Sequence, residues 1–277
     1  LLIAFWVRNF PNPKFDSQTK ERLTSSAGSV KEHYEKSEIK DFKIIAKKIF
    51  AAADIIEPII EAQIAKKNAD EKRDSLVAQK KLKKVKVAKH VAASSPNAAL
   101  SLCEGDSAKG FFISVRDPKK HGIYPLRGVV MNTWDLKPSE VLKNKELSEV
   151  IAILNLDINK PDDISDMSYK EVWTLTDADV DGNKISTLLF AFFYKFWPKL
   201  FSLGKISMLK TPIMIASKGK QSHWSYTYED ADEFKKNNKG WEIRYIKGLG
   251  LLTEDEYRQI LNEPMLYKIT IDDVEKS

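Results

Sequence analysis

Apolar residues recur at helical spacing in two long stretches of the chain. The first stretch runs from about Ser37 to Lys89, and its apolar residues lie three or four positions apart, which predicts a helix. These residues are Ile39, Phe42, Ile45, Ile49, Ala53, Ile56, Ile60 and Ile64. Pro58 should kink or split this helix, because proline lacks the backbone N–H. The second stretch follows i, i+3, i+4, i+7 spacing without a miss and predicts a helix at Ile185, Leu188, Leu189, Phe192, Phe193, Phe196 and Trp197.

Two short apolar runs, 98–103 and 172–176, have the length and composition of buried strands. Strands that alternate with helices predict an α/β fold with a mostly parallel sheet flanked by helices on both faces. Residues 1–16 alternate apolar and polar positions and predict strand and loop. The break at Ser94-Ser95-Pro96-Asn97 marks a domain boundary between the helical part and the α/β part.

Composition excludes several classes of protein. The sequence has no apolar run near the roughly 20 residues of a membrane span. The opening Leu1 to Val7 lacks the charged start and cleavage site of a signal peptide, and is better interpreted as a strand of a larger protein. A single cysteine, Cys103, excludes a disulfide within the chain and indicates a reducing compartment. With four scattered histidines, any metal should be bound by oxygen.

Charge is spread unevenly along the chain. Residues up to Asn97 include 20 basic and 12 acidic side chains, whereas the remainder has 25 basic and 27 acidic ones. The basic part, with a lysine-rich segment from Lys80 to Lys89, favours a polyanionic partner. A solvated helix face is the alternative explanation for charge alone.

Acidic residues follow both predicted strands. Glu104 and Asp106 follow the first strand, and the second runs into Asp177, Asp179 and Asp181. Carboxyl ends of parallel strands share one edge of a sheet, where functional groups gather. Closely packed carboxylates are best tolerated around a cation, and an all-oxygen set favours Mg²⁺, with Mn²⁺ possible.

The acids in these two motifs have other possible explanations. Acid-rich surface turns are common, and Asp106 or Asp181 could cap a helix. The run from Asp177 to Gly182 matches the start of an EF-hand loop. That loop needs a bidentate Glu at position 12, where this chain has Leu188, so calcium binding of that kind is rejected.

The two acidic motifs together resemble the metal site of the Toprim fold. They are Glu-Gly-Asp-Ser-Ala at 104–108 and Asp-x-Asp-x-Asp-Gly at 177–182. Tyr-Pro-Leu-Arg-Gly at 124–128, Lys-Thr-Pro at 210–212 and Arg-Tyr-Ile-Lys-Gly-Leu-Gly at 244–250 narrow the resemblance to type IIA DNA topoisomerases. Similarity to gyrase B-type subunits and the split topoisomerase of T-even-like bacteriophages runs from about Ser94 to Tyr257. The segments at 144–147 and 197–201 lean toward the phage form, which would place the protein in a bacterial host cytoplasm.

The resemblance implies a division of the chain. Residues 1–36 would be the C-terminal end of an ATPase transducer domain, 37–93 a basic helical linker and 94–277 the Toprim domain. Ser17-Gln18-Thr19-Lys20 resembles the transducer loop that reaches the terminal phosphate of ATP, through Gln18 and Lys20. The ATP-binding domain itself would precede this chain.

The resemblance also implies roles. Glu104, Asp177, Asp179 and Asp181 would hold Mg²⁺, and Glu104 would also act as general acid or base. Lys109, Arg127 and Lys247 would contact the DNA backbone, with Lys109 and Arg127 assisting catalysis. The enzyme would pass one duplex through a double-strand break made by a tyrosine of a gyrase A-like partner, in a two-fold assembly. None of this chain's nine tyrosines would be the nucleophile.

Two positions depart from the family pattern. Val129 stands where a lysine usually follows Pro-Leu-Arg-Gly, and Asn183-Lys184 replaces the Ser-His of bacterial members. The metal ligands are unchanged, so cleavage chemistry should survive, while DNA contacts near the cut and any drug site there should differ. A Toprim nuclease or primase, and a non-enzymatic DNA-binding module, are the alternatives. The first leaves the Gln-Thr-Lys segment unexplained and the second leaves the clustered acids unexplained.

Overall fold

The computed structural model describes residues 10–16, 23–26, 28, 29, 32, 47, 50–83, 85–177 and 179–275. The chain divides into two compact units, residues 1–70 and 71–277. The predicted ATP-contacting residues Gln18 and Lys20 lie outside the described residues, so their role stays a prediction. The bounds of the three predicted domains also stay predictions. No helix among the described residues is long and apolar enough to cross a membrane.

The long helix α3 runs from Ala53 to Leu82 and contains Pro58. The predicted split at Pro58 is wrong, because the helix continues through the proline and the break in the helix lies at Ala52. The alternative, a kink at Pro58, stays a prediction. Pro58 falls in the second turn of α3, close to the helix start, where few intrahelical N–H bonds precede it. The helix also ends seven residues before Lys89, so part of the lysine-rich segment follows it as a loop.

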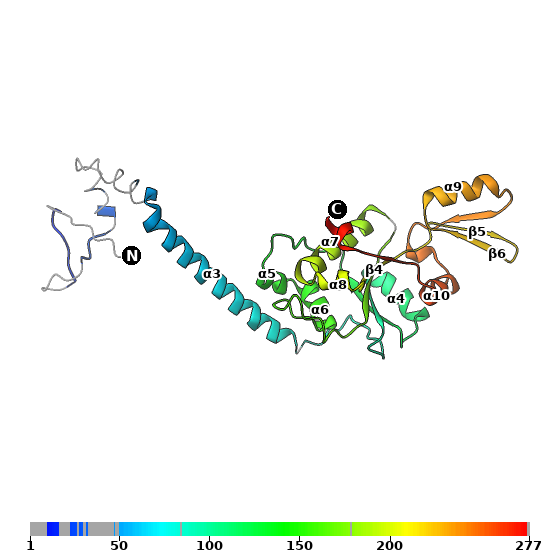
Figure 1. Cartoon of the computed structure of the whole chain (residues 1–277), viewed down its shortest axis with the longest axis horizontal. Coiled ribbons are helices and arrows are strands. Elements are labelled where there is room, and N and C mark those ends of the chain that lie inside the picture. Colours follow the sequence, from blue (N-terminus) through cyan, green and yellow to red (C-terminus); the bar gives the residue numbers. More distant parts are fainter. Residues whose placement is uncertain are drawn as a thin grey trace. The chain divides into compact units, whose positions relative to one another are not determined.

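A five-stranded sheet forms the centre of the second unit (Figure 1). Its strands are β1 (Ala99–Glu104), β2 (His121–Leu126), β3 (Glu171–Leu175), β4 (Ile206–Leu209) and β8 (Leu266–Lys268). The order is β2-β1-β3-β4-β8; the first four strands are parallel, and β8 is antiparallel to β4. The predicted mostly parallel sheet is therefore confirmed.

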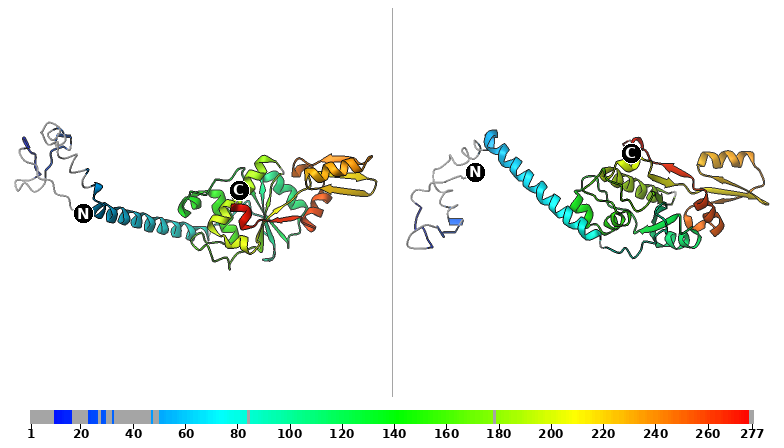
Figure 2. Two further views of the ribbon diagram at one scale, coloured as in Figure 1. Left: turned by 45° about the horizontal axis from the view of Figure 1, so that its top comes forward. Right: turned by 60° about the horizontal axis from the view of Figure 1, so that its bottom comes forward.

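Helices cover both faces of this sheet (Figure 2). They are α4 (Gly105–Val115), α5 (Pro138–Lys143), α6 (Lys145–Leu154), α7 (Val180–Phe196), α8 (Lys199–Ser202), α10 (Glu254–Asn262) and α11 (Ile271–Glu275). Successive strand residues face opposite sides. In β1, Leu100 and Leu102 belong to the core shared with α6 and α7, whereas Ala99 and Cys103 belong to the core shared with α4 and α10. Burial on both faces explains why the strands are continuous apolar runs.

A smaller module is inserted between β4 and β8. It consists of β5 (Met214–Lys218), β6 (Gln221–Ser225), α9 (Tyr228–Asn237) and β7 (Glu242–Tyr245), with strand order β6-β5-β7 and all pairs antiparallel. It has its own small core around Met214, Ala216 and Ala231. We call residues 213–246 the arm; it extends away from the five-stranded sheet in both views of Figure 2. The sequence patterns had not predicted it.

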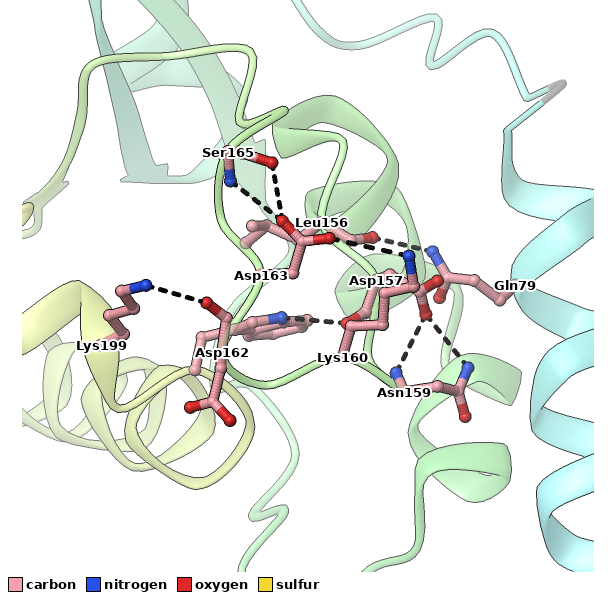
Figure 3. Close-up of polar contacts among 10 residues, drawn as sticks. Gln79, Leu156, Asp157, Asn159, Lys160, Asp162, Asp163, Ser165 and Lys199 are labelled. Carbon is pink, nitrogen blue, oxygen red and sulfur yellow. Dashed lines mark hydrogen bonds and ion pairs between the residues drawn. The ribbon is translucent and has the colours of Figure 1, made fainter.

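Polar side chains four residues apart in the last three turns of α3 form hydrogen bonds with the rest of the second unit. Glu71 accepts hydrogen bonds from the Ser139 N–H at 2.9 Å and from its hydroxyl at 2.6 Å. Ser75 donates to Asn159 Oδ1 at 2.6 Å. Gln79 Nε2 donates to the Leu156 carbonyl at 2.8 Å (Figure 3). We call Glu71, Ser75 and Gln79 the polar seam.

Candidate metal centre

The predicted acidic residues meet at one edge of the sheet. Strands β1 and β3 are parallel neighbours with Cys103 opposite Leu175, so Glu104 is level with Thr176 and one step from Asp177. Strand β2 ends opposite Glu104, which places Arg127 at the same edge. The Thr176 and Ser186 hydroxyls lie 3.1 Å apart, which joins the end of β3 to α7. The sheet topology therefore gathers residues that are far apart in sequence.

Glu104 and Asp106 are only two residues apart but lie in opposite electrostatic surroundings. Partial burial raises the pKa of Glu104, and the carboxylates of Asp177, Asp179 and Asp181 raise it further. The pKa of Asp106 is lowered by its hydrogen bond from Lys89, whose Nζ lies 2.5 Å from Asp106 Oδ2. The two acids of the first motif therefore differ in their neighbours. Glu104 belongs with the aspartates, and Asp106 with cations.

Asp177 is fixed by the backbone of a motif 70 residues later. Its Oδ1 accepts a hydrogen bond from the Leu249 N–H at 3.0 Å. A Cβ on Gly248 would lie 2.8 Å from Asp177 Oδ2, and a Cβ on Gly182 would lie 2.1 Å from the Asp177 carbonyl oxygen. A side chain at Gly182 would collide with the backbone of Asp177, and one at Gly248 would displace the Asp177 carboxylate. The Lys-Gly-Leu-Gly motif had been recognised in the sequence, but this contact had not been predicted.

Asp179 caps the helix that follows the second acidic motif. Its side chain accepts a hydrogen bond from the Gly182 N–H at 2.8 Å, and its extended backbone precedes the first turn of α7. Asp181 lies in that first turn and is exposed. Helix capping by Asp106 or Asp181 is thus wrong, since Glu104 and Asp179 occupy the two cap positions. The negative charges at this helix start are favoured by the helix dipole.

The donor set fits a hard divalent cation. Four carboxylates share the edge, and burial, followed by the repulsion from the three aspartates, raises the pKa of Glu104. A bound cation would relieve that repulsion. No three acidic, histidine or cysteine side chains among the described residues are close enough together to hold a metal ion. Side-chain rotation toward a common point would therefore have to accompany binding. The ligand assignment stays a prediction.

Basic residues surround the same edge. Lys109 lies three residues after Asp106 in α4, and Arg127 follows the end of β2 at the same edge. After the hydrogen bond from Lys89, both cations help to lower the pKa of Asp106. Lys247 is exposed and directly precedes the glycine that contacts Asp177. Val129, the departure from the family pattern, is 48% exposed in the loop after Arg127. Positive side chains thus lie beside the acids.

Comparison with known proteins identifies the domain. Residues 99–209 match the Toprim domain family. DNA topoisomerase 2-beta of Gallus gallus is 33% identical over 280 residues, which cover 93% of this chain and 16% of that protein. DNA topoisomerase 2 of Plasmodium falciparum (isolate K1 / Thailand) is 33% identical over 273 residues, covering 93% of this chain and 19% of that protein.

A solved structure agrees with these relatives. The crystal structure of the Plasmodium falciparum topoisomerase II DNA-binding, cleavage and re-ligation domain superposes with a TM-score of 0.60 at 34% identity, covering 65% of this chain and 26% of that one. The chain spans less than a fifth of the length of the two curated relatives. These relatives are eukaryotic, so the expected lean toward the bacteriophage form is not supported.

Proposed function

We propose that this chain is the metal-binding cleavage and religation part of a type IIA DNA topoisomerase. The premise is that the chain contains a Toprim domain and is homologous to the Toprim-containing region of such enzymes. The convergence of Glu104, Asp177, Asp179 and Asp181 at one sheet edge supports this proposal. The whole enzyme would be ATP-dependent and would pass one duplex through a transient double-strand break.

The residues would divide the work as follows. Bound Mg²⁺ would supply charge stabilisation at the scissile phosphate. Asp177, held by the Leu249 N–H, and Asp179, held at the start of α7, would be pre-oriented ligands. Glu104, whose pKa is raised, would hold or release the proton of the leaving ribose oxygen. Lys109, Arg127 and Lys247 would bind the DNA backbone beside the cut.

Two parts of the reaction would depend on residues that the structure does not describe. The nucleophile would be a tyrosine on a gyrase A-like subunit or domain, and the reaction would occur in a two-fold assembly with double-stranded DNA. Gln18 and Lys20 would contact the terminal phosphate of ATP bound to a preceding domain. The similarity to DNA topoisomerase 2 over 93% of the chain supports both assignments.

Glu104→Gln and Asp179→Asn test the metal site. Each removes one negative charge at nearly constant shape, and Asn also caps helices well, so α7 should persist. We expect Mg²⁺ to raise the melting temperature of the parent chain but not of either variant. In the assembled enzyme, both variants should lose Mg²⁺-dependent cleavage and keep DNA binding, since lost charge lowers repulsion toward phosphate.

Asp162→Asn is the matched control. Asp162 is an exposed acid on the loop after α6, where its backbone carbonyl accepts from Lys199 Nζ at 3.2 Å (Figure 3). This variant should respond to Mg²⁺ and cleave DNA as the parent does. Near-parental cleavage by Glu104→Gln or Asp179→Asn would refute the metal-site assignment.

A further inference from the structure

The arm is rooted at the edge that bears the acids. Strand β4 is parallel to β3, so it ends at Leu209 on the same edge as Asp177, and the chain then enters β5. Strand β7 returns to Gly248 and Leu249, which contact the Asp177 carboxylate. Both ends of the arm therefore lie beside the candidate metal ligands.

Backbone and aromatic contacts hold the arm together. At its base, the Ile213 N–H donates to the Ser225 carbonyl and the Ile246 N–H donates to the Ile213 carbonyl, each at 2.9 Å. His223 stacks on Phe234 with centroids 3.9 Å apart and planes within 4°. Trp241 meets Phe234 edge-on at 5.1 Å. These contacts fix α9 on the small sheet, so the end of the arm is carried at a defined place.

Four exposed lysines gather at the end of the arm farthest from its root. Lys218 ends β5 opposite Gln221 of β6, and the turn between them adds Lys220. The end of α9 and the following turn add Lys236 and Lys239. We call Lys218, Lys220, Lys236 and Lys239 the tip lysines. Each of the two turns contains a glycine with positive φ, Gly219 at 61° and Gly240 at 82°, a conformation that keeps turns tight.

Few acids offset this charge. Asp232 pairs with Lys235 at 2.5 Å, and Glu242 begins β7 beside Ser217. The remaining acids of α9, Glu229, Asp230 and Glu233, precede its last turn. Lysines at a helix end are favoured by the helix dipole, which would account for Lys236 alone. It does not account for two lysines on the β5–β6 turn that converge on the same place.

The length of β5 can be expressed as a number of base pairs of duplex DNA. The five residues of β5 span about 17 Å at ~3.3 Å per residue. Duplex DNA rises ~3.4 Å per base pair, so this reach corresponds to about five base pairs. We propose that the tip lysines bind the phosphate backbone of the duplex held at the acidic edge, roughly five base pairs from the position of cleavage. This inference rests on the proposed function and adds a second, flanking DNA contact.

Salt dependence of DNA binding tests the contact. Lys218→Ala/Lys220→Ala should weaken duplex binding and reduce the slope of log Kobs against log salt by about 2, because each phosphate contact contributes ~0.9. Lys119→Ala/Lys120→Ala is the matched control, since these lysines are also exposed in a turn but precede β2 at the opposite edge of the sheet. The control should keep the parental slope.

A tethered DNA-cleaving reagent locates the tip on the duplex. Cys103 is the only cysteine and is buried, and burial raises the pKa of its thiol to about 12, so Lys220→Cys would carry the reagent alone. In the assembled enzyme on a duplex with one mapped cleavage site, we expect iron–EDTA at this position to cut the DNA about five base pairs from that site. Lys119→Cys should give only background cutting.

The outcomes separate the two proposals. If the parent chain binds duplex DNA and the tip variant keeps its slope, or if Lys220→Cys cuts no more than Lys119→Cys, the tip contact is refuted and the proposed function stands. A parent chain that shows no salt-dependent duplex binding contradicts the proposed function and the tip contact with it.

Discussion

Three glycines near Asp177 differ in what a side chain would meet. At Gly182 a Cβ would lie 2.1 Å from the backbone oxygen of Asp177, whereas at Gly248 it would lie 2.8 Å from the carboxylate. At Gly250, two residues further along the same motif, nothing lies within 4 Å. Backbone cannot yield without moving the strand end, but a carboxylate can turn away. Gly182 is therefore required by the backbone of Asp177 and Gly248 by the position of its carboxylate, whereas Gly250 is sterically free.

Gly248→Ala should displace the Asp177 carboxylate and break its hydrogen bond with the Leu249 N–H. We expect Mg²⁺ affinity, measured by calorimetry on the chain, to fall roughly tenfold, as for loss of other contacts that orient a metal ligand. The free energy of unfolding without metal should change by less than about 1.5 kcal/mol, because one hydrogen bond contributes ~1 kcal/mol.

Gly250→Ala controls for the added methyl group and for the change in backbone freedom. It should bind Mg²⁺ like the parent. Equal Mg²⁺ affinity in Gly248→Ala and Gly250→Ala would show that the position of Asp177 does not matter for the metal.

Lys195 shows what a linear pattern misses at the scale of one residue. In the sequence it interrupts the longest apolar run. In the structure its Nζ donates to the carbonyls of Thr133 at 2.8 Å, Trp134 at 2.5 Å and Leu136 at 2.6 Å. It thereby fastens the loop after Arg127 to α7. Hydrogen bonds to carbonyls 60 residues away depend on the tertiary fold and leave no periodic signal.

Elements with strong patterns were the predictable ones. The unbroken spacing from Ile185 to Trp197 corresponds to α7, and the apolar runs at 98–103 and 172–176 correspond to β1 and β3 within one residue. The acidic residues follow the two strands as expected. The arm was missed because its strands have only four or five residues and polar or half-exposed positions in β6 and β7. Their stability comes from packing with α9, which local patterns do not encode.

The polar seam makes the end of α3 part of the second unit. Ser75 and Gln79 are 1% and 5% exposed, although most of α3 is exposed. Buried polar groups are costly without partners, and here each has one. The spacing of four residues places Glu71, Ser75 and Gln79 on one face of the helix. An apolar-periodicity search overlooks such a face because it is polar.

Gln79→Ala should destabilise the second unit by about 1–3 kcal/mol, because it removes the donor to the Leu156 carbonyl and leaves that oxygen buried. Urea unfolding measures this difference. Lys80→Ala, at the neighbouring exposed position, controls for the change in helix propensity and should alter stability by less than about 0.5 kcal/mol. Equal midpoints for the two variants would mean that the seam contributes nothing.

At the scale of the whole molecule, basic and acidic side chains are concentrated in different parts of the chain. The first 97 residues carry the excess of lysine and arginine, while the acids concentrate where the sheet ends. On the arm the order reverses within one helix, with acids near its start and lysines at its end. A duplex that approached the acidic edge would thus meet positive groups beside the edge, at Arg127 and Lys247, and again at the tip lysines. Such an arrangement would attract phosphate toward an edge whose carboxylates would otherwise repel it.

The isolated chain should be catalytically silent and become active only with its partner. Its acids would supply metal binding and charge stabilisation, and Lys109, Arg127 and Lys247 would supply backbone contacts, but the family pattern assigns the attack on phosphorus to none of the described residues at this edge. Tyr124 and Tyr257, the tyrosines of the neighbouring strand and helix, are buried, and burial raises the pKa of both hydroxyls. We therefore expect the attacking tyrosine to come from the partner.

A double-strand cut also needs two such sites on opposite strands, which a closed two-fold assembly places most simply. We expect no nicking of supercoiled plasmid by this chain with Mg²⁺ alone, and Mg²⁺-dependent cleavage with protein attached to the DNA 5′ ends once the tyrosine-bearing partner is added. Adding the partner together with the Glu104→Gln chain should give assembly without cleavage. Nicking by the partner-free chain that disappears in Glu104→Gln would instead identify a Toprim nuclease, because the same metal centre would then be activating water without a tyrosine.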